Sequence, residues 1–227
     1  GKRLSEVVQE ASDMPLERLI VLSGPNLAAE IVRGIPTATV VASVNPDAAE
    51  QAQQLFMTPT LRVYTNDDLI GVELGGALKN VYAIGAGVSD GLGFGDNTKG
   101  ALLTRGLAEM MRLGAALGAR PETFMGLTGV GDLFATAASK LSRNYRLGYA
   151  MAQGASPEEA LQQLGQVAEG YPTALVAERL ANQHGVEMPL LNAIASLLRS
   201  ERCVRDALQS LMTRPPKGER EFRFVRF

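Results

Sequence analysis

Residues 71–95, GVELGGALKNVYAIGAGVSDGLGFG, have the apolar spacing of a helix but contain far more glycine than an isolated helix tolerates. Each interior glycine costs a helix roughly 0.8 to 1 kcal/mol relative to alanine, so four of them cost about 3 to 4 kcal/mol together. The four are Gly75, Gly76, Gly85 and Gly87. Only close packing can offset this cost. We therefore predict that the rest of the chain is organised around this helix and that its neighbours approach it closely.

One face of this helix is predicted to lie in the core and another to border a ligand. The core stripe at helical spacing consists of Leu74, Leu78, Val81, Gly85 and Val88. Lys79 lies instead among small residues, which leave room for a ligand beside its amine. The alternative is an ordinary packed helix from which Lys79 extends its charged end to water. The pattern by itself leaves both interpretations open.

Composition places the chain among globular proteins of one or two domains, since 227 residues that are 46% hydrophobic can bury a core. A net charge of -2 gives no general attraction to nucleic acid or to an anionic membrane, and we expect neither as a partner. Cys203 is the single cysteine and no apolar run has transmembrane length, which favours a cytoplasmic protein. The single histidine, His184, lies at a predicted helix end, so we assign proton transfer to a lysine or a carboxylate. We expect no metal site.

The N-terminal third alternates predicted strands and helices. Apolar runs predict strands at 19–22, 37–42 and 61–65. Between them, helices are predicted at 27–33 and 47–56. This order and spacing is typical of βαβ units in a parallel sheet.

Helix-start signals support this interpretation. Asn26 and Asn45 are candidate N-caps, and Pro46 suits the first position of its helix. A further short helix is predicted near the N-terminus, where Leu4, Val7 and Val8 are apolar.

Beyond Asp68 the predicted elements are all helical. They span 69–88, 97–117, 121–125, 132–138, 143–153, 157–164, 173–183 and 189–199. We place a domain boundary near Asp67, which gives an α/β unit at 1–67 and an all-helical unit at 68–227. The tail after Met212 is rich in proline and arginine and is interpreted as a frayed or partner-covered end.

The glycine-rich segment SDGLGFGDN, residues 89–97, precedes a helix as phosphate-binding loops do. It lacks the Gly-Lys-Ser/Thr ending of a phosphate loop, and Asp90 and Asp96 would repel an anion. We therefore predict a simple connection.

Four motifs occur in an order that resembles a known enzyme family. They are VELGGALKNVYAIGAGVSDGLGFGDNTKGALLTRGLAEM (72–110), MGLTGVGDL (125–133), LSRN (141–144) and QVAEG (166–170). Together they resemble the signature of the NAD(P)-dependent glycerol-3-phosphate dehydrogenases, and the resemblance covers nearly the whole chain. It implies the end of a Rossmann-like domain followed by a helical substrate domain of the 6-phosphogluconate dehydrogenase-like type.

The resemblance implies a cytoplasmic oxidoreductase that interconverts sn-glycerol 3-phosphate and dihydroxyacetone phosphate with NAD or NADP. The product of the reductive direction is a precursor of glycerophospholipids. A homodimer is a further implied feature, and the only ligands implied are the cofactor and a small phosphorylated substrate.

The resemblance also assigns roles to residues of the catalytic centre. Lys79 would be the acid/base, while Asp132, Asn80 and Thr136 would order the lysine and the substrate hydroxyls. Taken without the resemblance, Asp132 is interpreted more simply as an N-cap of the following helix. An amine beside a carboxylate keeps its proton more strongly, whereas burial weakens it.

The implied binding residues fall into two groups. The substrate would contact Gly24, Asn26, Ser142, Arg143 and Asn144, in addition to Lys79 and Asp132. The cofactor would contact Ala28, Arg143, Val167 and Glu169. Arginine forks match phosphate oxygens in a bidentate manner, which suits Arg143 to the phosphate. From its residues alone, LSRN could equally be an exposed helix cap.

Several positions depart from the family pattern. Asn26 stands where the family usually has serine, and Tyr171-Pro172 stands where Val-Arg is more usual. No G-x-G-x-x-G follows a strand. We therefore interpret the chain as a C-terminal part of the enzyme and expect these 227 residues to be inactive by themselves.

The sequence leaves two rival functions open. A non-catalytic helical interaction module would use its glycines as packing devices. A related β-hydroxyacid dehydrogenase would act on another substrate, although the phosphate-binding side chains of LSRN argue against it.

Overall fold

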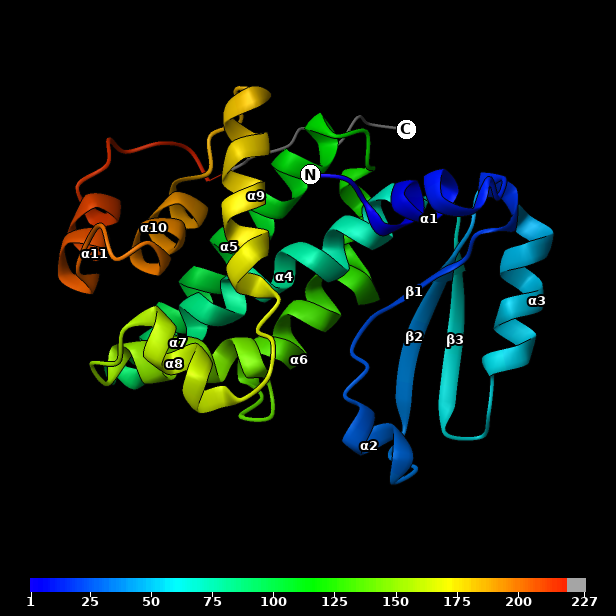
Figure 1. Ribbon diagram of the computed structural model, residues 1–227, viewed down its shortest axis with the longest axis horizontal. Helices are drawn as coiled ribbons and strands as arrows, with labels where there is room; N and C mark the ends of the chain where they lie inside the picture. Colours follow the sequence, from blue (N-terminus) through cyan, green and yellow to red (C-terminus); the bar gives the residue numbers. More distant parts are fainter. Residues whose placement is uncertain (220–227) are drawn as a thin grey trace.

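The computed structural model describes residues 1–219, and the predicted tail lies partly outside them. Figure 1 shows two parts, a three-stranded sheet with short helices around it and a larger group of helices. The first part contains α1 (Leu4–Ser12), the 3₁₀ turn η1 (Leu16–Arg18), β1 (Val21–Ser23), α2 (Ala28–Val32), β2 (Thr37–Ala42), α3 (Pro46–Phe56) and β3 (Leu61–Asn66). The predicted order, α/β and then all-helical, is confirmed.

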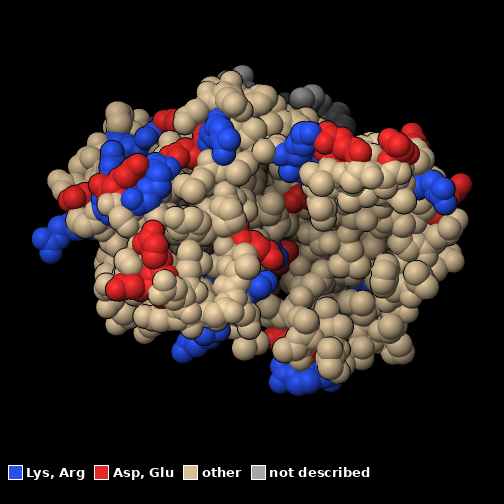
Figure 2. Space-filling view, in the orientation of Figure 1, with Lys and Arg blue, Asp and Glu red and all other residues tan. Residues whose placement is uncertain are grey.

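The second part begins two residues after β3 ends. It contains α4 (Leu69–Gly91), α5 (Asp96–Ala116), the 3₁₀ helix η2 (Pro121–Met125), the π-helical turn η3 (Leu127–Gly131), α6 (Asp132–Ala138), α7 (Arg143–Ala152), α8 (Pro157–Leu164), α9 (Gly170–Gln183), α10 (Pro189–Leu198) and α11 (Val204–Met212). Within residues 1–219 no helix combines the length and the apolarity needed to cross a bilayer. Figure 2 shows basic and acidic side chains intermixed over both parts.

The sheet has the strand order β1–β2–β3 and is mixed. β2 and β3 run parallel, with Thr37 opposite Leu61 and Ala42 opposite Asn66, as predicted. β1 runs antiparallel to β2, with Val21 opposite Ala42. The prediction of a fully parallel sheet is therefore wrong for the first pair.

Helix length explains the difference. α3 has 11 residues, and a helix of that size is about 16 Å long, similar to the roughly 20 Å of a six-residue strand. It can return the chain along the sheet to start a parallel strand, and Figure 1 shows it beside β3. α2 has 5 residues and lies at one end of the sheet. The chain turns back at that end, which makes β2 antiparallel to β1.

One of the two predicted helix caps in this part is confirmed. Asn45 accepts a hydrogen bond from the N–H two residues on, and Pro46 is the first residue of α3. Asn26 does not cap α2, because Leu27 is the residue that precedes that helix. The side-chain amide of Asn26 instead donates to Thr39 Oγ1 at 2.9 Å.

The glycine-rich helix α4 is central, as predicted. It is buried over most of its length and packs against α5, α6, α7 and α9. A Cβ at Gly87 would lie 2.0 Å from the carbonyl oxygen of Tyr145, and a Cβ at Gly148 in α7 would lie 1.9 Å from that of Ile84. The two helix backbones therefore touch, and glycine on both sides permits the contact.

The helical part differs from prediction at a few boundaries and in one element. α4 continues to Gly91, so the predicted connection at 89–97 is shortened to 92–95. α9 begins at Gly170 rather than Thr173, because proline is tolerated in the first turn of a helix. α11 was not predicted; it is a nine-residue helix that packs against α10.

Candidate active site

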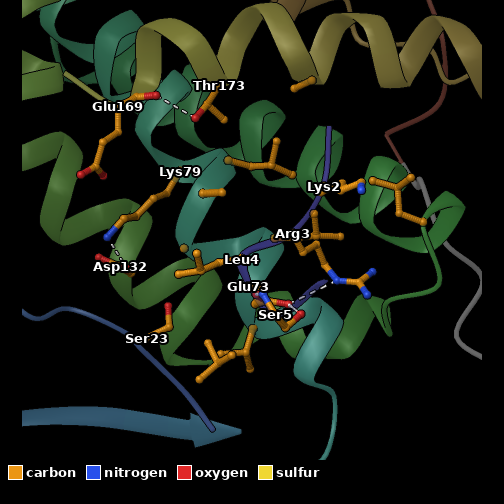
Figure 3. Close-up of a pocket in the computed structure, with 18 of the residues that line it drawn as sticks. Lys2, Arg3, Leu4, Ser5, Ser23, Glu73, Lys79, Asp132, Glu169 and Thr173 are labelled. Atoms are coloured by element: carbon orange, nitrogen blue, oxygen red, sulfur yellow. Dashed lines mark hydrogen bonds and ion pairs between the residues drawn. The ribbon is translucent and has the colours of Figure 1, made fainter. Parts of the chain in front are cut away.

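A cavity of about 1070 Å³ lies between the sheet and the helices. Its walls come from α1, the end of β1 and the turn after it, α4, α6 and α9. Of the predicted site residues, the cavity is lined by Gly24, Asn26, Lys79, Asp132, Thr136 and Glu169. Residues more than a hundred positions apart thus border one space, which Figure 3 shows in close-up.

Lys79 and Asp132 form an ion pair on the cavity wall. Lys79 extends from the middle of α4 toward Asp132 at the start of α6 (Figure 3). Their side chains are 17% and 4% exposed. Lys79 therefore does not extend into water, and Asp132 is the first residue of α6 with Gly131 before it, so the simple capping interpretation of Asp132 is wrong.

The environment of Asp132 combines burial with several stabilising contacts. Burial raises the pKa of the Asp132 carboxyl, and this effect outweighs the Lys79 ammonium, the Thr136 hydroxyl and the Gly24 N–H, which all lower the pKa. Thr136 Oγ1 donates to Asp132 at 3.2 Å. A shielded amine and carboxylate at the edge of a cavity can exchange a proton with a ligand oxygen placed there.

A buried amide network joins three helices beside Lys79. Asn144 donates from its side chain to Asn80 Oδ1 at 2.9 Å and accepts from the Gly170 N–H at 2.8 Å. Asn80 in turn donates to the carbonyl oxygen of Gly76 at 3.2 Å. The start of α7 and the start of α9 are thereby held to α4.

Arg143 and Glu169 lie next to this network and are more exposed. Their side chains are 41% and 61% exposed and form an ion pair at 3.5 Å. Ser142 is buried and caps α7 by accepting a hydrogen bond from the Tyr145 N–H at 3.2 Å. Asn144 and Ser142 thus serve the local structure, while the Arg143 guanidinium is open to solvent.

Three of the four predicted cofactor residues, Ala28, Arg143 and Val167, do not line the cavity. Ala28 is exposed on α2. Val167 is 67% exposed and borders a smaller hollow between α8 and α9.

Three residues that the sequence reasoning gave no role also shape the site. Ser23 and Thr128 share a buried hydrogen bond. A Cβ at Gly170 would lie 2.5 Å from the carbonyl oxygen of Asn80, so glycine is needed for its N–H to reach Asn144. The only sequence signal for Gly170 was its place at the end of the QVAEG motif.

Glu73, six residues before Lys79, anchors α1 to the edge of the cavity. It accepts hydrogen bonds from the backbone N–H and the hydroxyl of Ser5, at 2.8 and 2.6 Å. Arg3 Nε lies 3.2 Å from the same carboxylate (Figure 3). No pattern in the sequence indicated this contact, because α1 and α4 are far apart along the chain.

The segment 89–97, which was predicted to be a simple connection, has a structural role. Asp90 accepts from Lys99 Nζ at 2.6 Å and from the Tyr145 hydroxyl at 2.7 Å. These bonds tie the last turn of α4 to α5 and α7, so only residues 92–95 of the predicted connection lie outside a helix.

Comparison with known proteins identifies the family. A family model described as the NAD-dependent glycerol-3-phosphate dehydrogenase C-terminus matches residues 68–209, and the corresponding N-terminus model matches residues 1–49. Proteins named glycerol-3-phosphate dehydrogenase (NAD(P)+) from Thermoanaerobacter sp. (strain X514) and Pelotomaculum thermopropionicum are each 54% identical over 96% of this chain. The chain spans 65% and 63% of their lengths.

A solved structure agrees with these matches. The glycerol-3-phosphate dehydrogenase of Coxiella burnetii is 42% identical and superimposes with a TM-score of 0.83, over 86% of this chain and 60% of that one. The fold of this chain therefore recurs in that enzyme. The chain belongs to the NAD-dependent glycerol-3-phosphate dehydrogenase family.

Proposed function

We propose that this protein interconverts sn-glycerol 3-phosphate and dihydroxyacetone phosphate by hydride transfer with NAD or NADP. The observation that carries the proposal is the Lys79–Asp132 ion pair on the wall of a cavity lined by both parts of the chain. Oxidation of an alcohol and reduction of a ketone both need a group that exchanges a proton with the oxygen. A shielded amine beside a carboxylate meets that need.

The phosphate is proposed to bind at Arg143. Its ion pair with Glu169 is long and solvent-accessible, and such pairs contribute little free energy. A phosphate offers a bidentate, doubly charged partner and would displace the carboxylate. Asn144 would keep the start of α7 in place beside Arg143, and Ser142, Gly24 and Asn26 would complete the substrate contacts.

The cavity has room for a nicotinamide beside the substrate. Its volume of about 1070 Å³ lies at the upper end of the roughly 300–1,000 Å³ of small-molecule sites. We propose that Ala28, Arg143, Val167 and Glu169 hold the NAD or NADP, with Glu169 at the cavity and Val167 exposed nearby. When bound, the nicotinamide supplies or accepts the hydride.

Lys79 is proposed to carry the proton. In the oxidative direction its neutral amine takes the proton of the C2 hydroxyl while the C2 hydrogen leaves with its electron pair. In the reductive direction its ammonium returns a proton to the C2 carbonyl oxygen. Asp132 pairs with the amine, and Thr136 and Asn80 keep this pair in position. We take reduction as the physiological direction, which would supply a glycerophospholipid precursor.

A chimera tests the activity. The segment of the Thermoanaerobacter relative that this chain does not span would be joined to the chain, and oxidation of NADH and NADPH would be followed with dihydroxyacetone phosphate. We expect turnover that is lost in the same chimera with Lys79→Ala. Turnover of a non-phosphorylated β-hydroxyacid instead would contradict the proposal and favour the related dehydrogenase.

The rival interaction module is tested by thermal unfolding of the chain. Glycerol 3-phosphate should raise the unfolding temperature more than sulfate at equal concentration, because a ligand that binds only the folded state stabilises it. An equal response to the two anions would favour a module without a specific site.

We also propose a cytoplasmic location, a homodimer, and two domains that meet near Asp67. The exposed, unpaired Cys203 is compatible with a reducing compartment. The proposed boundary is supported by the end of β3 at Asn66 and by Asp68, whose carboxylate accepts from the Gly71 N–H at the start of α4. Light scattering of the purified chimera would report the dimer.

A further inference from the structure

A buried pair of hydroxyls joins the sheet to the helices near the ion pair. Ser23 ends β1 and Thr128 lies in η3. Their side-chain oxygens are 2.7 Å apart although the residues are separated by 105 positions. Thr128 is 1% exposed and Ser23, which lines the cavity, is 9% exposed.

The donors in this pair can be assigned from chemistry. Thr128 Oγ1 lies 2.9 Å from the carbonyl oxygen of Val72 in α4 and donates to it. A hydroxyl has one proton, so Ser23 is the donor between the two hydroxyls. The resulting chain, from Ser23 to Thr128 to Val72, connects β1, η3 and α4.

Two of the glycines of α4 make room for this pair. A Cβ at Gly76 would lie 2.8 Å from Ser23 Oγ, and a Cβ at Gly75 would lie 2.9 Å from the carbonyl oxygen of Thr128. These distances are shorter than ordinary contacts. The double glycine that precedes Lys79 thus allows β1 and η3 to reach the helix.

Each hydroxyl is close along the chain to a group that acts on the ion pair. Ser23 precedes Gly24, whose backbone N–H is one of the groups that lower the pKa of the Asp132 carboxyl. Thr128 lies in the π-helical turn that leads directly into Asp132, and such turns are frequent at functional sites. The other groups that act on this carboxylate are Lys79 from α4 and Thr136 from α6 itself.

We propose that Ser23 and Thr128 are positioning residues, whose hydrogen bond holds the turn after β1 against η3 and so fixes the position of Asp132, which directly follows η3. Thr128 does not line the cavity, so its effect reaches the reaction through Asp132 and Lys79. The catalytic meaning of this inference rests on the proposed function. The test does not rest on the proposed function, because the ionisation of Asp132 can be measured without any turnover of substrate.

The test is the titration of the Asp132 carboxyl, followed by carbon-13 NMR in the 227-residue chain. Thr128→Val keeps the side-chain shape and removes the hydroxyl. We expect Asp132 to titrate at higher pH by about one pH unit, because its charged form loses part of its hydrogen bonding. Thr128→Ser keeps a hydroxyl and should restore the titration of the parent chain.

Thr123→Val is the matched control. Thr123 lies in η2 rather than in η3 and is 6% exposed. Its hydroxyl donates a hydrogen bond to Asp68 at 2.6 Å. It should lower stability without moving the Asp132 titration. An unchanged titration in Thr128→Val, or an equal shift in Thr123→Val, would overturn the proposal.

Ser23→Ala gives a second, milder test if Thr128→Val does not fold. It leaves the Thr128–Val72 bond in place and should shift the titration in the same direction. Parent-like titration in this variant would also overturn the proposal. Failure of the chimera to turn over substrate is a separate result, which would count against the proposed function.

Discussion

At the scale of single residues, the site depends on charged groups that differ in burial. Lys79 and Asp132 are shielded and paired, whereas Arg143 is open to solvent. Burial strengthens an electrostatic interaction and exposure leaves a group free to exchange partners. This difference suits the first pair to proton transfer and Arg143 to capture of an anion, and it leads to two predictions.

Lys79→Ala in the chimera should lower kcat by roughly 10² to 10⁴, the usual effect of removing a positioned acid or base. The affinity for the cofactor should change little. Lys99→Ala is the matched control, because Lys99 is 25% exposed and pairs with Asp90 at 2.6 Å outside the cavity lining. Steady-state rates of Lys79→Ala within a few-fold of the parent chimera would remove this residue from the mechanism.

Arg143→Ala should weaken the preference for glycerol 3-phosphate over glycerol by roughly 10- to 150-fold, since a hydrogen bond to a charged group contributes about 1.5 to 3 kcal/mol. The measurement is the ratio of kcat/KM for the two substrates. Arg146→Ala, an exposed arginine on the same helix, should leave that ratio unchanged. An unaltered ratio in Arg143→Ala would place the phosphate elsewhere.

At the scale of elements, the contact between α4 and α7 brings two helix backbones directly together. Gly87 and Gly148 place each helix backbone against a carbonyl oxygen of the other. α7 begins with Arg143 and Asn144, so the position of the proposed phosphate site depends on this contact. Any side chain at these glycines must push the two helices apart.

Gly87→Ala should therefore destabilise the protein by about 3 kcal/mol or more, since overpacking of a tight contact typically costs about 1–3 kcal/mol and here the obstacle is backbone. Gly100→Ala is the control. Gly100 lies in α5, and a Cβ there would meet nothing within 4 Å. It should stabilise by roughly 0.5 to 1 kcal/mol. Urea unfolding measures both, and equal effects of the two changes would contradict the packing account.

At the scale of the whole molecule, Glu109 joins three helices within the main core. It lies in α5 and is 2% exposed. It accepts hydrogen bonds from the N–H groups of Leu190 and Leu191 at 2.7 and 2.9 Å and from the Tyr82 hydroxyl at 3.1 Å. Burial is the main reason that the pKa of its carboxyl is raised.

The raised pKa makes global stability depend on pH. The folded state binds the proton more tightly than the unfolded state, so the contribution of Glu109 is greatest below its ordinary pKa near 4.5 and declines as pH rises through the folded value. Glu109→Gln cannot ionise and leaves one backbone N–H without an acceptor. We expect it to be less stable than the parent by about 1 to 3 kcal/mol at low pH.

The difference in unfolding free energy between the parent and Glu109→Gln should narrow as the pH is raised toward neutrality. Urea unfolding of both proteins across this range measures it. A difference that widens with pH would mean that the ionised form of Glu109 is the one the fold prefers.

Signals carried by residues close together in the sequence were sufficient to predict much of the fold. Asn45-Pro46 predicted the start of α3, because caps act within one helical turn. The glycine pattern predicted a closely packed central helix, and the motifs predicted the family. Asn26 is not a cap, because α2 begins two residues later; its side-chain amide donates to Thr39 on the next strand, and its Oδ1, the atom that would cap a helix, accepts no hydrogen bond.

Local signals were thus enough to predict most of the helical segments, the central helix and the family, although α11 was missed. Only the tertiary structure decided the direction of β1, the pairing of Asn144 with Gly170, and the contact of Ser23 with Thr128. The two groups of features differ in the separation of the interacting residues along the chain. Propensity and capping act between residues a few positions apart, whereas these three features join segments that meet only after the chain has folded.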